Sequence, residues 1–496
     1  MQPILTARAP APAFHLARPR RERIAVAVFM LLAALFLFGD LAPDPIALWD
    51  ESRNIINALE MRRTGLSLVT TFQFEPDLWN TKPPLLIWLM AGSVALFGPT
   101  ETALRLPSAV AALATLLVVI AWTRRATGSL PAALGAAAIL VLSPGFFAVH
   151  GARTADYDAL LVFCTTTYLA LLYFEILKRR PSAKLLAAAG LAVAAAVMTK
   201  SIAGLLPGLG VALFMLLTRR LPRLWANRAY LLMALVAALP PLLFFALREA
   251  AAPGYLAAVL SNDTVGRFID SQVGRYEPAW FYLNDALKGW FFAGPLLLFA
   301  PYGWRSLPAR GRFLVGYCLC TALALLVLLS LASTKLTHYL LSAYPLLAVA
   351  AAILLRSAWH RLWNRAGDER TRLLLAFAVA VPLALLAARA GYWRYVSLPA
   401  LQRSQEGAYS RLFASLAAQG EPGVTVSEPG FLLAPWPNYA PILRSYQLLW
   451  AERGFAVVRG DRGPLVASCD PLTAGRLARI GPDVGHVPGC IAVRSR

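Results

Sequence analysis

Long apolar runs separated by short polar segments fill the chain from about residue 24 to about residue 390. A helix that crosses a bilayer needs roughly 17 to 25 predominantly apolar residues. Runs of this kind, or slightly shorter, lie at 24–41, 83–98, 106–122, 131–148, 159–177, 184–199, 202–217, 229–247, 287–303, 312–331, 338–355 and 373–390. The pattern predicts an all-α polytopic membrane protein.

The polar segments between these runs differ in charge. Arginine and lysine gather in "RPRRER", "TRR", "KRRPSAK", "TRRLPRLWANR", "RSLPARGR" and "RSAWHRLWNR". Short cytoplasmic loops are enriched in these residues, so we place these segments, and the N-terminus with them, in the cytoplasm. The formal net charge of +21 therefore reflects membrane topology, and no nucleic-acid partner is predicted.

Basic segments that share one side of the membrane require an even number of crossings between them. Three apolar runs lie between "RPRRER" and Arg124, so only two of the three can cross. Run 83–98 is the shortest and opens with two prolines, so we predict that it forms an interfacial or re-entrant helix on the outer face. About eleven crossings then remain. An odd count puts the tail outside, in the periplasm of a bacterial inner membrane.

The composition agrees with this topology. The chain is 58% hydrophobic and 15% charged, with a mean hydropathy of +0.58, which excludes an ordinary soluble protein of this length. No small-residue cleavage site follows the first apolar run. We therefore interpret that run as a retained helix and not as a signal peptide.

The tail has a different pattern. We divide the chain into a transmembrane domain at 1–390 and a soluble periplasmic domain at 391–496, where short β-like runs alternate with Gly/Pro turns and predict a small α/β fold. Cys469 and Cys490 lie in this tail, and an oxidising compartment permits a disulfide, although two cysteines alone do not prove pairing. The other cysteines, Cys164, Cys318 and Cys320, lie in apolar runs as small buried side chains.

In this orientation, the unusual polar clusters all fall at the outer ends of helices. They are Asp50, Glu51 and Arg53; Lys82 in "NTKPP"; Arg153, Asp156 and Asp158 in "GARTADYD"; Lys200 in "MTKS"; and Lys335, His338 and Tyr339 in "STKLTHY". Ionisable groups near hydrocarbon are costly unless they are paired or functional. Lysines and arginines there could hold a lipid-linked phosphate, and carboxylates could act as a general base on an acceptor hydroxyl. The mixture fits glycosyl transfer from a lipid phosphate.

Structural explanations exist for the same residues. Asp50 and Glu51 suit a helix N-terminus, Arg53 could pair with either, and Lys82 could reach lipid head groups. Asp156 or Asp158 could cap a helix, and His338 could be structural. The histidines (His15, His150, His338, His360 and His486) share no metal-ligand spacing. No cofactor is predicted, while a divalent ion held by Asp50 and Glu51 stays open.

Five stretches in a fixed order resemble a known family. "LWDESRNIINALEM", "NTKPPLLIWL", "GARTADYDALLVF", "MTKSIAGLLPGLG" and "STKLTHYLLSAYP" are similar to the bacterial branch of the protein mannosyltransferase and lipid A aminoarabinose transferase superfamily, which has the GT-C fold. The resemblance covers about residues 20–360. It implies an inverting glycosyltransferase that takes a sugar from a polyprenyl-phosphate donor at the outer membrane face. The Ala- and Arg-rich, Lys-poor composition is typical of a bacterial protein, so the acceptor that we expect is lipid A, another glycolipid or a cell-envelope glycan.

Matching these stretches residue by residue completes the predicted site. The resemblance implies that Asp50, with Glu51 and Arg53, is the acidic segment of the first external loop. It also implies that Asp158, after Arg153, is the second external acid, with Asp156 ranked lower. Residue types and resemblance together give Asp50, Glu51 and Asp158 as catalytic residues, and Lys82, Arg53, Arg153, Lys200, Lys335 and Tyr339 as donor-phosphate contacts. "LSAYP" stands where many members have a version with an additional proline, which affects the local backbone.

Other functions stay open from the sequence alone. A flippase or transporter for a lipid-linked sugar would also need outward cations and a lipid groove, but it would favour charges near the midplane. Protein O-mannosyltransfer would use the same donor chemistry. A membrane-anchored binding protein that works through its tail would not need the polar clusters of the helical part.

Overall fold

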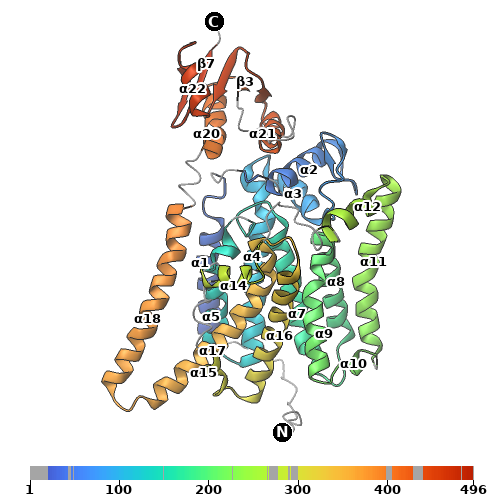
Figure 1. Cartoon of the computed structure of the whole chain (residues 1–496), viewed down its shortest axis with the longest axis vertical. Helices are drawn as coiled ribbons and strands as arrows, with labels where there is room; N and C mark the ends of the chain where they lie inside the picture. The colour runs from blue at the N-terminus through green and yellow to red at the C-terminus, as the bar shows by residue number, and fades with distance from the viewer. Residues whose placement is uncertain are drawn as a thin grey trace.

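The computed structural model describes residues 20–494 apart from 43–45, 49, 149, 226, 265, 267–276, 289–290, 292–299, 398–404, 428–439 and 482. Most of the predicted crossing at 287–303 lies outside the described residues. Figure 1 shows a bundle of long helices below a small sheet that contains the C-terminal end of the chain.

Among the described residues, seven helices are long and apolar enough to cross a membrane. They are α4 (Glu101–Thr127), α7 (Tyr157–Ile176), α8 (Ala183–Lys200) with the turn η1 (Ser201–Gly204), α11 (Arg228–Ala251), α16 (Ala309–Leu331), η4 (Thr337–Ala343) with α17 (Tyr344–Arg365), and α18 (Glu369–Tyr392) with η5 (Trp393–Ser397). Three further predicted crossings correspond to α1 (Arg20–Phe38), α5 (Leu130–Val141) and α9 (Leu206–Leu217). The all-α membrane architecture is confirmed, and the count of about eleven crossings stays a prediction.

The helices begin where the sequence supplies caps. The side chains of Thr100, Ser129 and Ser182 each accept a hydrogen bond from a backbone N–H of the first turn of α4, α5 and α8. α8 packs between α7 and α11. A Cβ at Gly190 would lie 2.6 Å from the carbonyl oxygen of Met233, so the close approach of α8 and α11 requires glycine there.

One end of the bundle carries α2 (Asp50–Thr64), the hairpin β1 (Thr71–Phe72) and β2 (Glu75–Pro76), and α3 (Leu85–Phe97). α3 has 13 residues, fewer than a bilayer crossing needs, which agrees with the prediction for run 83–98. The remaining short elements are α6 (Pro144–Phe147), α10 (Pro222–Trp225), α12 (Tyr255–Val259), η2 (Leu260–Thr264), α14 (Phe281–Leu287) and α15 (Ala300–Trp304).

The tail forms the predicted small α/β region. Its five-stranded sheet has the order β4-β3-β5-β7-β6, with β3 parallel to β4 and β5 and the other pairs antiparallel. The strands are β3 (Gly423–Val426), β4 (Ala456–Arg459), β5 (Leu465–Ser468), β6 (Asp483–Val487) and β7 (Cys490–Arg494), and the helices are α20 (Gln405–Ala418), α21 (Pro441–Ala451) and α22 (Pro471–Leu477).

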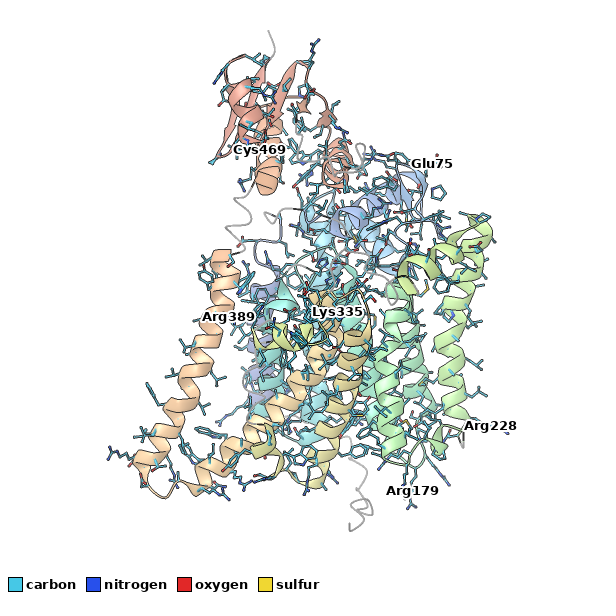
Figure 2. The ribbon with its side chains drawn as sticks, in the orientation of Figure 1. Glu75, Arg179, Arg228, Lys335, Arg389 and Cys469 are labelled. Carbon is cyan, nitrogen blue, oxygen red and sulfur yellow. A yellow bond between two sulfur atoms is a disulfide. The ribbon has the colours of Figure 1, made fainter. Side chains whose placement is uncertain are left out.

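The tail rests on the end of the bundle that carries α2. The Ser445 hydroxyl on α21 donates to the carbonyl oxygen of Ser52 at 2.9 Å, and Arg444 lies 3.1 Å from Glu60. Figure 2 shows Glu75 and Cys469 at this end, whereas Arg179 and Arg228 lie at the opposite end of the bundle. The polar clusters and the basic loops are therefore separated along the helix axes.

Candidate active site

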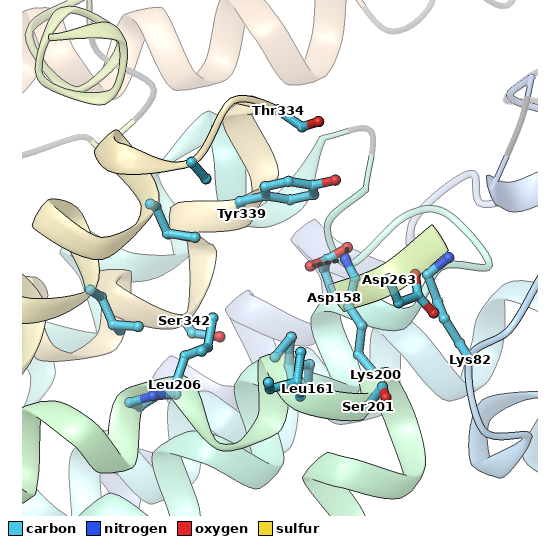
Figure 3. Close-up of a pocket in the computed structure, with 16 residues that line it drawn as sticks. Lys82, Asp158, Leu161, Lys200, Ser201, Leu206, Asp263, Thr334, Tyr339 and Ser342 are labelled. Carbon is cyan, nitrogen blue, oxygen red and sulfur yellow. Dashed lines mark hydrogen bonds and ion pairs between the residues drawn. The ribbon is translucent and has the colours of Figure 1, made fainter. Parts of the chain in front are cut away.

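A pocket opens between α7, α8, α9 and α16, and its lining changes from charged to apolar (Figure 3). The polar lining consists of Lys82, Asp158, Lys200, Ser201, Asp263, Thr334, Tyr339 and Ser342. The apolar lining consists of Leu161, Ile202, Ala203, Leu206, Pro207, Leu325, Leu329 and Ala332. Four of the predicted site residues, Lys82, Asp158, Lys200 and Tyr339, are brought together here from distant parts of the sequence.

Lys200 and Asp158 form the central ion pair of this pocket. The Lys200 ammonium at the end of α8 lies 2.8 and 2.6 Å from the two carboxylate oxygens of Asp158, which is in the first turn of α7. The same nitrogen lies 5.5 Å from the centre of the Tyr339 ring. Since both charged side chains are at helix ends that are packed together, the pair has a fixed position.

Lys82 and Asp50 continue the charged region. The Lys82 ammonium lies 3.6 Å from one carboxylate oxygen of Asp50 and 5.4 Å from the centre of the Tyr157 ring. The side chain of Lys82 is 7% exposed and that of Asp50 is 24% exposed. Asp50 therefore has a partly open face next to a buried cation.

The structure adds His150, which the sequence reasoning missed. Its Nδ1 atom makes a very short contact with a carboxylate oxygen of Asp156 and lies 4.0 Å from an oxygen of Asp50. The rings of His150 and His338 are stacked with centroids 4.0 Å apart. Burial alone would lower the pKa of His150, but the carboxylates of Asp156, Asp50 and Asp158 raise it to about 9. The signal in the sequence was its position at the start of "HGARTADYD".

Two sets of side chains in the described part of the chain bring three metal-binding atoms within 4.8 Å of one another. One is Asp50, His150 and His338, and the other is His150, Asp156 and Asp158. The pair Asp50 and Glu51, for which the sequence left a divalent ion open, is not one of these sets. Because Nδ1 of His150 contacts the Asp156 carboxylate directly, these side chains form a hydrogen-bonded cluster.

Glu51 has structural partners. It is 1% exposed, and its carboxylate oxygens accept hydrogen bonds from Arg105 at 2.7 and 3.1 Å. They also accept the backbone N–H groups of Ala47 and Ala155 at 2.7 and 2.9 Å. Glu51 thus fixes the start of α2 to α4 and to the segment before α7.

Arg53 and Arg153 also contact the protein scaffold. Arg53 makes a two-pronged contact with Asp77 at 2.8 and 2.7 Å. Burial would raise the pKa of the Asp77 carboxyl, but Arg53 and the Asn80 backbone hold that pKa below its ordinary value. Arg153 donates to the carbonyl oxygens of Leu37, Gly39 and Asp40 at the end of α1. Neither arginine lines the pocket described above.

Lys335 follows the pocket residue Thr334, and its ammonium donates to the carbonyl oxygen of Ala332 at 2.7 Å.

Asp156 begins α7 as its N-cap and accepts the backbone N–H of Tyr157 at 2.7 Å. Of the two residues in "ADYD", Asp156 therefore caps the helix, while Asp158 faces the pocket and Lys200.

Comparisons with known proteins agree with this architecture. The model of the family described as dolichyl-phosphate-mannose-protein mannosyltransferase matches residues 81–244. A Pseudomonas fluorescens protein named undecaprenyl phosphate-alpha-4-amino-4-deoxy-L-arabinose arabinosyl transferase 2 is 29% identical over 72% of this chain and 61% of its own length. The enzyme of the same type from Shewanella sediminis is 29% identical over 64% of this chain and 57% of its own length. The chain thus spans less than two thirds of the length of these relatives.

Solved structures match over nearly the whole chain. ArnT from Cupriavidus metallidurans bound to undecaprenyl phosphate superposes with a TM-score of 0.66 at 17% identity, covering 95% of this chain and 97% of that one. The apo state of the same protein gives a TM-score of 0.63 at 19% identity, covering 95% and 98%. The resemblance seen in the sequence is thereby confirmed: this chain is similar to the aminoarabinose transferases and has the fold of ArnT.

Proposed function

We propose that this protein is an inverting glycosyltransferase that moves a sugar from a polyprenyl-phosphate donor to a lipid or glycan acceptor. The observation that carries the proposal is the pocket in which buried cations adjoin an apolar wall. A polyprenyl phosphate has the matching chemistry, because its phosphate needs charge-assisted hydrogen bonds and its tail needs an apolar surface. The similar fold of ArnT, whose structure is bound to undecaprenyl phosphate, supports this donor class.

The roles of the residues follow from their positions. Lys82, Lys200 and Tyr339 line the pocket and would hold the donor phosphate. Asp158 would position Lys200 through the ion pair. Asp50 would orient the acceptor and, if the acceptor is a hydroxyl, take its proton. Glu51, Arg53 and Arg153 would act indirectly by fixing the backbone that carries these groups, and Lys335 would support the segment before Tyr339.

In the proposed reaction, an acceptor oxygen attacks the anomeric carbon of the sugar as the bond from that carbon to the phosphate oxygen breaks. The bonding electrons leave with the phosphate, so negative charge grows where Lys82 and Lys200 lie. Fixed cations at such a position stabilise the transition state more than the ground state. No cofactor is proposed.

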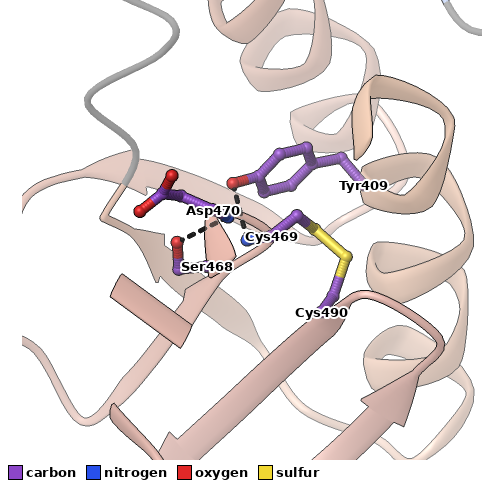
Figure 4. The surroundings of a disulfide bond; sticks show 5 residues. All are labelled: Tyr409, Ser468, Cys469, Asp470 and Cys490. Carbon is purple, nitrogen blue, oxygen red and sulfur yellow. Dashed lines mark hydrogen bonds between the residues drawn. A yellow bond between two sulfur atoms is a disulfide. The ribbon is translucent and has the colours of Figure 1, made fainter. Parts of the chain in front are cut away.

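The membrane orientation is part of the same proposal. We place the site and residues 391–496 in the periplasm of a bacterial inner membrane and the N-terminus in the cytoplasm, with a domain boundary near residue 390. The arginines at the end opposite the site support this orientation (Figure 2). Cys469 and Cys490 form a disulfide, and the Tyr409 hydroxyl beside it accepts the backbone N–H of Cys469 (Figure 4). The disulfide favours an oxidising compartment for the tail.

The test is donor turnover by purified protein in nanodiscs. Undecaprenyl phosphate linked to a pentose, a hexose or a uronic acid is offered with total bacterial lipid, and released undecaprenyl phosphate is measured. We expect turnover of one donor, and a loss of roughly 10²- to 10⁴-fold in Asp50→Asn. If no donor turns over while a lipid-linked sugar crosses a liposome bilayer that contains the protein, the protein is a transporter and the proposal is wrong.

A further inference from the structure

His150 lies on a tight turn between α6 and α7. Its backbone φ is 62°, which is the left-handed region. The backbone N–H of Gly151 donates to the carbonyl of Ala148, and that of Ala152 donates to Phe146, each at 2.9 Å. A non-glycine residue keeps such a conformation when its surroundings demand it, and these residues cluster at functional sites.

Neighbours on several sides fix the His150 ring. Asp156 contacts Nδ1, and Asp156 is itself 1% exposed and fixed as the N-cap of α7. The His338 ring lies parallel to the His150 ring within 28° and touches the edge of Tyr339 at a centroid distance of 4.9 Å. The imidazole is therefore held between the helix that carries Asp158 and the segment that carries Tyr339.

This fixed ring lies next to the residue proposed to meet the acceptor. His150 Nδ1 is 4.0 Å from one oxygen of Asp50, and Lys82 Nζ is 3.6 Å from the other. The Asp50 carboxylate is thus placed between a lysine and a histidine that approach it from the segments before α3 and before α7. The two contacts favour one orientation of the carboxylate and leave its exposed face open, which suits a group that orients a reacting atom.

We propose that His150 is a positioning residue of the transfer reaction, which Asp156 holds in place and which fixes the Asp50 carboxylate for the acceptor. The inference rests on the proposed function, because it assigns Asp50 to the acceptor. It separates the site into two halves. Lys82, Lys200 and Tyr339 hold the donor, whereas Asp156, His150 and Asp50 form a row that orients the acceptor.

This division gives a test with two readouts. Binding of undecaprenyl phosphate reports the donor half, and sugar release from the donor that the panel identifies reports the whole site. His150→Phe keeps a ring against His338 but removes the nitrogen that contacts Asp156. His150→Asn keeps an N–H donor near the position of Nδ1 and tolerates a positive φ. His360→Phe, on the exposed far part of α17, is the matched control.

We expect His150→Phe to lower kcat about 100-fold and His150→Asn to lower it about tenfold. Both variants should keep the Kd for undecaprenyl phosphate within threefold, and His360→Phe should match the wild type. Asparagine fills less of the space against His338, so packing alone would not produce the partial recovery. Asparagine also accepts the positive φ of residue 150 more readily than phenylalanine does, so the recovery supports the positioning role only when both variants unfold at the temperature of the wild type.

Other results overturn the proposal in distinguishable ways. If His150→Phe keeps kcat within threefold of the wild type, His150 has no part in the reaction. If both variants lose donor binding together with thermal stability, His150 only supports the fold. If a chelator abolishes turnover, and Mn²⁺ restores turnover in the wild type but not in the His150 variants, then His150 holds a metal ion together with Asp50 and His338 and does not act as proposed. If the wild type neither binds undecaprenyl phosphate nor turns over any donor, the proposed function fails and this inference with it.

Discussion

The two acidic residues at the start of α2 are adjacent in the sequence and have different surroundings. Asp50 is 24% exposed at its side chain, and Lys82 and His150 lie 3.6 and 4.0 Å from its oxygens. Glu51 is buried, and its oxygens contact Arg105 and two backbone N–H groups at 2.7 to 3.1 Å. Asp50 has longer ionic contacts and an open face, whereas Glu51 is enclosed by short ones.

The same contrast separates two groups of buried charges. Lys200 and Asp158 line the pocket, where a ligand can reach them. Glu51 with Arg105, and Arg53 with Asp77, connect elements in places that the pocket does not reach. Removing one partner of a buried pair leaves an uncompensated charge, so both groups matter for folding. They should differ in what happens when both partners are neutralised.

The largest effect should come from neutralising the pocket pair. The double variant Lys200→Gln, Asp158→Asn removes both charges of the pair, so neither is left buried without its partner and the fold should remain. Turnover should fall by more than about 10³-fold, because the leaving phosphate loses a fixed cation. Turnover of the identified donor and thermal unfolding measure the two consequences. Lys184→Gln, an exposed position at the other end of α8, is the control and should behave as the wild type. Turnover within tenfold of the wild type would remove Lys200 from the site.

The second effect should be on stability. Glu51→Gln leaves the buried guanidinium of Arg105 without its carboxylate, and breaking a buried pair in this way costs about 3–5 kcal/mol. Thermal unfolding in detergent, followed by tryptophan fluorescence, should show a large decrease in midpoint temperature. The purified protein that stays folded should keep its affinity for undecaprenyl phosphate. An unchanged midpoint with lost turnover would instead place Glu51 in contact with substrate.

The sequence predicted much of this arrangement. The apolar periodicity and the polar clusters at helix ends identified the membrane helices, the α/β tail and four pocket residues, Lys82, Asp158, Lys200 and Tyr339. It did so because a charged residue at the end of an apolar run needs a specific reason to be there. That argument detects unusual residues without identifying their partners.

The partners depend on tertiary contacts, and this is where sequence reasoning stopped. Arg53 was predicted as a donor-phosphate contact, which stays a prediction, and the sequence did not reveal its pair with Asp77 in the segment between α2 and α3. Arg105 is a lone arginine in an apolar stretch and could have been recognised as needing a carboxylate. His150 and His338 are too far apart in the sequence for a spacing rule, yet their rings are stacked. The packing of α6 and α7 against η4 brings them together.

A third prediction concerns the disulfide in the tail. Cys469 and Cys490 close a loop with a sequence separation of 21 residues. Cross-linking a loop of about this length stabilises a fold by about 3 kcal/mol, because the cross-link lowers the conformational entropy of the unfolded chain. The double variant Cys469→Ala, Cys490→Ala should therefore have a less stable sheet, and its Kd for undecaprenyl phosphate should stay within threefold of the wild-type value. Limited proteolysis, with cleavage mapped to residues 405–494, measures the first effect. Equal protease resistance of the two proteins would show that the sheet does not depend on the disulfide.

The smallest effect is expected where the tail meets α2 at its exposed edge. Glu452 lies 2.9 Å from Arg62 and 3.6 Å from Arg63, whose side chains are 38% and 35% exposed. Ion pairs of this kind contribute about 0–1 kcal/mol, because water and salt screen them. Glu452→Gln should shift the unfolding midpoint by no more than a few degrees and leave turnover unchanged, with the shift disappearing at high salt. A large loss of turnover would mean that the position of the tail on α2, and through it the orientation of Asp50, depends on this contact. The contrast between enclosed scaffold charges and reachable site charges would then extend beyond the bundle to the tail.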